Sequence, residues 1–284
     1  LRFRADGASS DLERADLLHR LGELHATSLD DLTTALDTFE EAVSAVPGHA
    51  NTVASLERLV TGQAHRLRIT QILEPLYQQA GEWEKLIRVR EAELIHITDA
   101  DQRIAMYHRI AEDAEERLMD PVRAFEVHGR ALRERPLEER TGEEVERLAG
   151  MIDGGWEQLA NAYADVLGIE GNDAATQASI GKRLARVFEE ELADVAKAEE
   201  TYRYVLTVVP SEVEALANLD RIYSLLEQWP ELAGVLEQRA EAAEDARDKV
   251  ELNSRLGQVY EEQLGQVTDA IRAEDPDRLV IVDA

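Results

Sequence analysis

The sequence has no cysteine, and this absence excludes disulfides, thiolate metal sites and a cysteine nucleophile. Glycine and proline are scarce, at 16 and 7 of 284 residues, so few positions interrupt a regular helix. No apolar run approaches the roughly 18 residues that a membrane span needs. Basic residues are also few: 31 Lys and Arg stand against 59 Asp and Glu, a formal net charge of −28. Because such a chain repels phosphate and anionic lipid, we expect no nucleic-acid partner and no direct membrane insertion.

Apolar residues make up 44% of the chain, enough to bury a core, and their spacing is helical. Ile180, Leu184 and Leu192 recur on one helix face, and residues 198–209 repeat the pattern. The break between the two stretches, at residues 193–194, is too short for anything but an antiparallel pair. The sequence therefore predicts an all-α chain of helical hairpins.

Internal repetition is the strongest feature of the sequence. Trp83, Trp156 and Trp229 are each 73 residues apart, and each is followed three positions later by leucine. A second pattern interleaves with this one: a small residue is followed by Ala after 13 positions, a ring after 17, a small or branched residue after 20 and Pro after 25. Its copies are Gly22, Ala35, Phe39, Ala42, Pro47; Ala111, Ala124, His128, Ala131, Pro136; Ala185, Ala198, Tyr202, Val205, Pro210; and a fourth that starts at Leu256, Gly257, Tyr260 and Ala270.

This order of small residues, rings and proline resembles the tetratricopeptide repeat, a helix-turn-helix of about 34 residues, and in particular long bacterial arrays of it. The 73-residue period would be two such units. The resemblance covers residues 10–272 and implies a right-handed superhelical solenoid of antiparallel hairpins with about 14–15 helices. Residues 1–9 are then an N-terminal extension and residues 273–284 an irregular C-terminal tail.

The hairpins that contain the tryptophans depart from the family pattern. Leucine stands in them where the family has a small alanine, and the small position of their first helix holds Glu74, Arg147 or Asp220. Small residues let two helices approach closely, so we expect looser contact between the helices of these hairpins. The tryptophans occupy equivalent positions, which favours a packing role over a ligand platform.

One interval is irregular. Pro47 lies 36 residues before Trp83, whereas the later intervals from proline to tryptophan are 20 and 19 residues. The roughly 16 additional residues predict an extra helix at residues 61–76, kinked near Pro75.

The C-terminal segment Ala270–Val282 resembles the helix-to-strand crossover of cellulase-type glycoside hydrolases with a β/α barrel. It contains none of that family's catalytic acids as a motif, so the resemblance implies no activity. A frayed tail or a junction is the simpler interpretation. The alternative is that the chain is a helical accessory or spacer region of a larger, carbohydrate-active enzyme.

The sequence shows no catalytic, metal or cofactor motif. Its seven histidines are scattered without metal-ligand spacing, and His128 stands at a ring position of the repeat, which predicts a packed ring rather than a ligand. No phosphate-binding glycine loop or nucleophile elbow occurs. We therefore expect neither catalysis nor a bound cofactor.

One set of polar residues resembles the peptide-carboxylate clamp of chaperone-cochaperone tetratricopeptide modules. The positions that match in type or keep a donor are Lys182, Arg186, Asn218 and Arg255, whereas Glu251 stands where the clamp has lysine. The resemblance implies a basic spot on the concave face, suited to a partner's carboxylate. The alternative is that these are ordinary helix-surface cations paired with neighbouring glutamates.

We accordingly expect a non-catalytic protein–protein interaction scaffold that binds a protein or peptide on a concave solenoid surface. Residues 1–10 lack a polar cap pattern and the last hairpin is incomplete, which predicts self-association or a missing flanking repeat. The sequence does not fix the compartment; a cytoplasmic location is slightly favoured.

Overall fold

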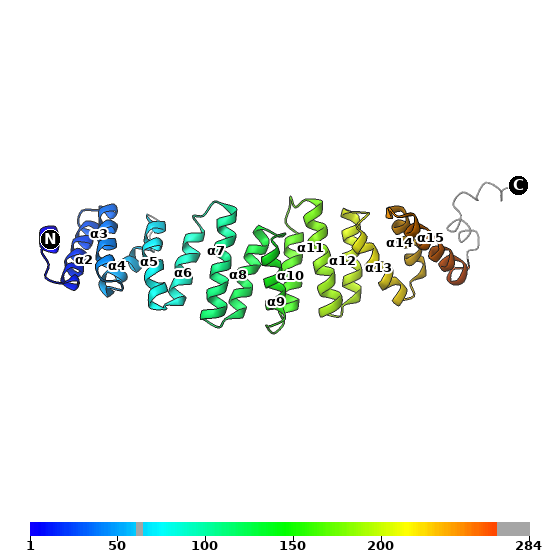
Figure 1. The fold of residues 1–284 in the computed structure, drawn as a ribbon, viewed down its shortest axis with the longest axis horizontal. Helices are drawn as coiled ribbons and strands as arrows, with labels where there is room; N and C mark the ends of the chain where they lie inside the picture. The colour runs from blue at the N-terminus through cyan, green and yellow to red at the C-terminus, as the bar shows by residue number, and fades with distance from the viewer. Residues whose placement is uncertain (61–64, 266–284) are drawn as a thin grey trace. The chain divides into compact units, whose positions relative to one another are not determined.

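The computed structural model describes residues 1–60 and 65–265, and it is built from helices and turns (Figure 1). These residues form fifteen α-helices and three short π-helical segments, and none of them lies in a strand. The predicted all-α class is therefore confirmed. The chain divides into two units, residues 1–131 and 132–284, which are described in turn.

The first unit contains the helices up to α8, which itself runs across the division between the units. They are α1 (Arg2–Asp6), α2 (Asp11–Thr27), α3 (Leu32–Ala45), α4 (Ala50–Val60), α5 (Arg66–Ala80), α6 (Trp83–Leu94), α7 (Ala100–Glu112) with the π-helical η1 (Asp113–Arg117), and α8 (Pro121–Glu134). The N-terminal segment is helical, and Ala5 of α1 is buried in a cluster with Leu17, Leu18 and Ala42.

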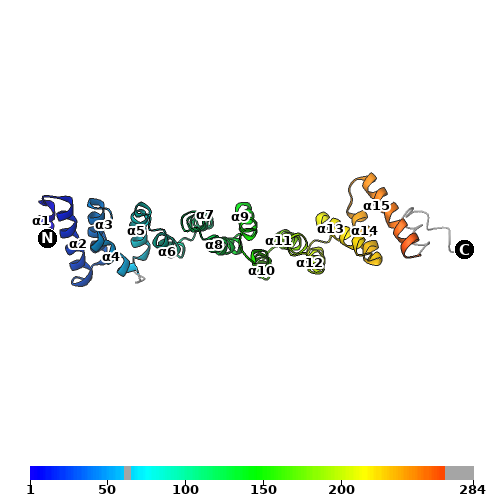
Figure 2. The ribbon, with the colours of Figure 1, turned by 90° about the horizontal axis from the view of Figure 1, so that it is seen from below.

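The second unit continues as consecutive antiparallel helices joined by short turns (Figures 1 and 2). They are α9 (Glu139–Ala149), α10 (Gly155–Leu167), α11 (Ala174–Arg186) with η2 (Val187–Glu191), α12 (Val195–Val208), α13 (Val213–Leu225), α14 (Trp229–Ala242), and α15 (Ala246–Gln258) with η3 (Val259–Gln263).

The same turn closes three of the hairpins. Its first residue has left-handed backbone, at Asp30, Met119 and Ala193, with φ of 53°, 54° and 51°. An aspartate follows each time, and its side chain accepts a hydrogen bond from the backbone N–H three residues later, which caps the second helix. Left-handed backbone costs a non-glycine residue roughly 1–2 kcal/mol, a cost that the cap and the packed hairpin offset.

The interval between Pro47 and Trp83 holds two helices, α4 and α5, whereas the two later intervals hold one each, α9 and α13. Of the extra helix predicted at residues 61–76, residues 61–64 lie outside the described part of the chain. Residues 66–76 belong to α5, which continues through Pro75 to Ala80. The predicted tail at residues 273–284 and the segment Ala270–Val282 also lie outside the described residues.

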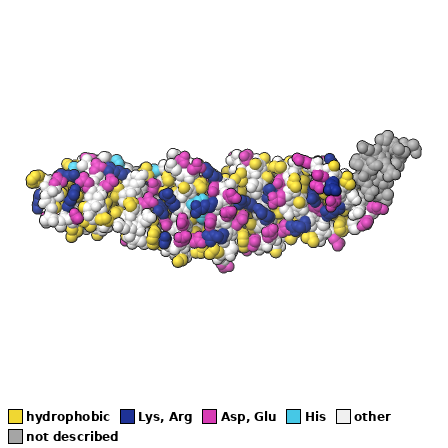
Figure 3. All heavy atoms as spheres, viewed as in Figure 1, with side chains coloured by type: hydrophobic (Ala, Val, Ile, Leu, Met, Phe, Trp, Pro, Cys, Tyr) yellow, Lys and Arg dark blue, Asp and Glu magenta, His cyan; other side chains and the backbone are white. Residues whose placement is uncertain are grey.

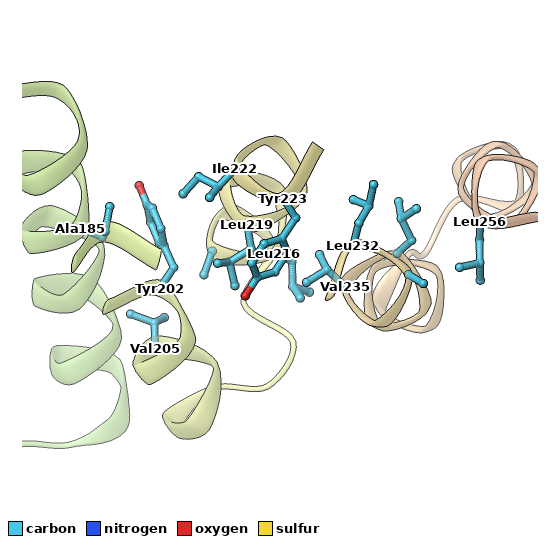
Figure 4. Packing of buried hydrophobic residues seen from close by; sticks show 14 of the residues in the cluster. Ala185, Tyr202, Val205, Leu216, Leu219, Ile222, Tyr223, Leu232, Val235 and Leu256 are labelled. Atoms are coloured by element: carbon cyan, nitrogen blue, oxygen red, sulfur yellow. The ribbon is translucent and has the colours of Figure 1, made fainter. Parts of the chain in front are cut away.

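The repeat positions pack as the pattern predicts. Tyr202 is fully buried and lies beside Ala185 (Figure 4), and both belong to one cluster that joins α11, α12, α13, α14 and α15. A Cβ atom built on Gly22 would lie 2.5 Å from the ring of Phe39, so this contact requires glycine. The other buried positions of the pattern are Ala35, Phe39, Ala42, Ala111, Ala124, His128, Ala131, Ala198, Val205, Leu256 and Gly257.

The rings of the repeat also serve packing. Trp83 and Trp229 are partly buried and pack against the clusters of their own units. Trp156 is partly buried at the start of α10. His128 is 4% exposed and its ring centroid lies 5.4 Å from that of His108. The prediction that His128 is a packed ring is confirmed.

In the hairpin of α5 and α6, the family's small position is occupied by one end of an ion-pair network. Glu74 of α5 accepts a hydrogen bond from Nε of Arg90 on α6 at 2.9 Å, and the same guanidinium pairs with Asp113 of η1. Arg90 is only 8% exposed in its side chain. A buried guanidinium flanked by two carboxylates thus joins α5, α6 and η1, where a pair of small residues would bring two helices together.

Candidate peptide-binding surface

The candidate site residues lie on three helices of the second unit, α11, α13 and α15. These helices are joined directly by charged side chains. Lys182 of α11 donates from Nζ to Glu212 at 2.8 Å and to Glu214 at 2.9 Å, at the beginning of α13. Glu212 also caps α13, because it accepts a hydrogen bond from the N–H of Ala215 at 2.8 Å. Lys182 therefore fixes α11 against the capped end of α13.

The environment of Lys182 keeps it charged. Partial burial lowers the pKa of its ammonium group, but the two hydrogen-bonded carboxylates outweigh this effect, so the pKa lies above its ordinary value. The side chain is 21% exposed. A partner's carboxylate would have to compete with Glu212 and Glu214 for this cation.

Arg255 of α15 is also held by a carboxylate. Its two terminal nitrogens lie 2.7 and 2.8 Å from the two oxygens of Asp220 on α13, and one of them also donates to Oγ of Ser224 at 2.9 Å. Asp220 is 4% exposed in its side chain and also pairs with Arg239 of α14. One buried carboxylate therefore binds two guanidinium groups and joins α13, α14 and α15.

The other two predicted residues differ from these. Arg186 is exposed near the end of α11, and among the described residues it has no hydrogen bond or ion pair. Asn218 is partly exposed on α13, and its Oδ1 accepts a long contact of 3.4 Å from Arg221. Within the described part of the chain, no hydrogen bond joins any of the four predicted residues to another. Of the three predicted cations, Lys182 and Arg255 are paired with carboxylates, whereas Arg186 is exposed and can pair with a group of a partner.

The points at which Lys182 and Arg255 attach to α13 are separated along its axis. Glu214 and Asp220 are six residues apart, which corresponds to about 9 Å of helix. The predicted residues thus follow a surface that extends along α13, and they do not converge on one atom of a ligand.

A cavity of about 520 Å³ lies between the beginning of α13, the end of α14 and one face of α15, from Asp248 to Arg255. This volume falls within the range of about 300–1,000 Å³ that is usual for ligand pockets. Its apolar lining is Val213, Leu216, Ala242, Ala243 and Leu252. Its charged lining is Arg239, Glu244, Asp248, Glu251 and Arg255.

Sequence reasoning finds only part of this surface. It identifies Arg255, but it misses Arg239, Glu244 and Asp248, because these residues meet only when α13, α14 and α15 pack together. Two signals in the sequence point to the arrangement: an acidic residue at the small position Asp220, and the reversed charge at Glu251. A buried carboxylate needs a cationic partner, which the neighbouring helices supply.

Charges of both signs are interspersed on the face of the molecule that Figure 3 shows. In the described residues no three His, Asp or Glu side chains come together in a way that could hold a metal ion. None of the helices in the described ranges combines the length and the apolar character that crossing a membrane requires.

Comparison with known protein families identifies the repeat. Residues 215–250 match the model of the tetratricopeptide repeat, a segment that covers most of α13, all of α14 and the beginning of α15. The predicted repeat positions recur in helical hairpins of both units. In the segment 215–250 the chain matches the tetratricopeptide repeat, which agrees with the resemblance carried by the spacing of its small residues, rings and prolines. No curated protein matches the chain.

Solved structures that are similar to this chain include three with low sequence identity. The C-terminal part of a TPR repeat-containing protein from Cytophaga hutchinsonii is 11% identical, with a TM-score of 0.38 over 85% of this chain and 96% of that one. BtubC from P. vanneervenii is 17% identical, with a TM-score of 0.31 over 85% and 89%. The TPR domain of P58(IPK) is 15% identical, with a TM-score of 0.30 over 88% and 78%.

Proposed function

We propose that this chain is a non-catalytic scaffold that binds a segment of a partner protein along α11, α13 and α15 of its second unit. Tetratricopeptide repeats suggest a protein–protein interaction role, because stacked hairpins expose an extended surface for a peptide. The observation that carries the proposal for this chain is the cavity of about 520 Å³ at the junction of α13, α14 and α15.

The relative positions of the three helices are fixed by contacts within the chain itself. Ion pairs through Lys182 and Asp220 hold α11, α13 and α15 in place, so a partner would not have to order them. Arg186 lies on α11 and Asn218 on α13, and in this proposal they supply further polar groups along the same helices. In this proposal Lys182 and Arg255 act on the partner mainly by positioning the helices.

A photo-cross-linking side chain tests the proposal at the cavity. Val213 lines the cavity and is 67% exposed, so we expect the fold to tolerate benzoylphenylalanine there. Val195 is the matched control, because it is the first residue of α12 as Val213 is of α13, is also exposed at 36%, and does not line the cavity. Irradiation in the lysate of the native host is expected to give a discrete adduct with one protein at position 213 and none at 195.

Circular dichroism must first show that both substituted chains are helical to the same extent as the unsubstituted chain. An Arg186→Glu variant, paired with Arg140→Glu on the exposed face of α9, then tests the polar contribution. We expect the adduct to weaken in the first variant only. Adducts that are absent at position 213, or equal at both positions, would refute binding at this surface.

A further inference from the structure

The charges that line the cavity of the second unit are not balanced by the protein itself. The two guanidinium groups, of Arg239 and Arg255, both pair with the buried carboxylate of Asp220. By contrast, the three carboxylates Glu244, Asp248 and Glu251 are exposed and form no hydrogen bond or ion pair with any residue that the structure describes. The positive charges of the cavity are therefore paired with a carboxylate, whereas its negative charges have no partner among the described residues.

The net charge at the cavity follows from this pairing. The guanidinium groups of Arg239 and Arg255 and the carboxylate of Asp220 together carry one positive charge. The three unpaired carboxylates change this sum to two negative charges. Asp248 lies in the first turn of α15, where a carboxylate also stabilises the helix. Glu244 precedes the helix and Glu251 lies beyond its first turn, so helix stabilisation does not account for them.

The apolar part of the cavity suits a long side chain. Val213 is 67% exposed at its edge, and Leu216 and Leu252 line it from α13 and α15. Lysine and arginine bury an aliphatic stem on such a surface while their charged head stays among polar groups. A carboxylate ligand, in contrast, would meet three unpaired carboxylates and two guanidinium groups that are already bound.

We propose that this cavity binds a lysine or arginine side chain carried by an extended segment of a partner protein. The stem lies against Val213 and Leu252, and the cationic head lies among Glu244, Asp248 and Glu251. The proposal rests on the scaffold function proposed above and specifies its partner: a basic segment, rather than the terminal carboxylate that the clamp resemblance implies.

The test uses capped nine-residue peptides, fluorescently labelled, in which three arginines alternate with leucine and alanine. Matched peptides carry glutamine or glutamate in place of arginine, and a fourth carries glutamine with a free C-terminal carboxylate. Fluorescence anisotropy with the full chain is expected to show binding of the arginine peptide at least about tenfold tighter than of the other three.

A matched pair of variants separates the cavity from the general acidity of the chain. The first variant, Glu244→Gln with Glu251→Gln, removes two open carboxylates of the cavity. The second, Glu190→Gln with Glu200→Gln, removes two exposed carboxylates of η2 and α12, so both variants have the same net charge. We expect the first to lose about tenfold in affinity for the arginine peptide, and the second to bind like the unsubstituted chain.

The outcomes distinguish the two proposals. Equal losses in both variants would overturn the assigned site, because the peptide would then respond to net charge alone. Tighter binding of the glutamate or free-carboxylate peptide, together with a cross-link at Val213, would overturn the basic-segment proposal and leave the scaffold function intact. Self-association that disappears only in the Glu244→Gln, Glu251→Gln variant would identify a second copy as the occupant and overturn it as well. If no peptide binds and Val213 captures nothing, both proposals fail.

Discussion

Replacing Asp220 with alanine restores the small residue that the repeat pattern has at this position, and we expect the change to destabilise the second unit. The carboxylate is 4% exposed and accepts charged hydrogen bonds from Arg239 and Arg255. Removing one partner of a fully buried ion pair costs about 3–5 kcal/mol. Here the guanidinium side chains are 27% and 42% exposed, so both can regain water, and we expect a loss of about 2 kcal/mol.

The expected loss of stability in Asp220→Ala is large because the Asp220 carboxylate pairs with two guanidinium groups. Arg255→Gln leaves Arg239 paired with Asp220, so it should cost only about 1 kcal/mol. A variant that replaces all three groups together, Asp220→Ala with Arg239→Leu and Arg255→Leu, should recover most of the lost stability, because it leaves no unpaired charge.

Hydrogen exchange of the backbone amides of α13, α14 and α15 in the full chain is the suitable assay. A repeat array opens locally, and a single global unfolding free energy would average over both units. The reasoning is refuted if Asp220→Ala leaves exchange in these helices unchanged or slows it, since a small residue would then stabilise the hairpin by closer packing. It is also refuted if Arg255→Gln costs as much as Asp220→Ala.

Two further changes test the first unit. Gly22→Ala places a Cβ atom 2.5 Å from the ring of Phe39 and should cost about 1–3 kcal/mol by hydrogen exchange in α2 and α3. Gly234→Ala, which meets no atom within 4 Å in the second unit, should gain about 0.5–1 kcal/mol by exchange in α14, and equal effects would contradict the packing argument. Burial raises the pKa of Glu93, and the nearby Glu74 raises it further, against the opposing charge of Arg90. The ionised form therefore destabilises the fold above that pKa, so Glu93→Gln should stabilise the chain at pH 7. The gain should vanish below about pH 4, where the carboxyl is protonated in both states; a gain independent of pH in thermal unfolding would argue against burial as the cause.

The sequence predicts the helical hairpins because their determinants are local or strictly periodic. Phe39 and Tyr202 fall at fixed offsets from small residues, and each is fully buried. The aspartates that cap the second helices are visible as well: Asp120 precedes Pro121, and the structure shows its side chain accepting from the N–H of Arg123. Such features require only knowledge of the helix period and of capping chemistry.

The charged contacts between helices are harder to predict. Arg90 reaches Glu74 at 16 residues and Asp113 at 23, and Asp220 reaches Arg239 at 19 and Arg255 at 35. These separations follow no single repeat offset, because each depends on the length of the side chain and on which turn of the next helix it meets. The sequence shows that a charged residue occupies a small position, but not which cation compensates for it.

This limit also explains why the same residues support opposite expectations about a ligand. In the sequence, Lys182 and Arg255 are two cations on first helices of the repeat and indicate a site for a carboxylate. In the fold, Glu212, Glu214 and Asp220 already bind these cations. The electrostatics that a partner meets are set by the groups left over after internal pairing, and at the cavity of α13, α14 and α15 those groups are carboxylates. Residue type at a repeat position therefore predicts the fold better than it predicts the partner.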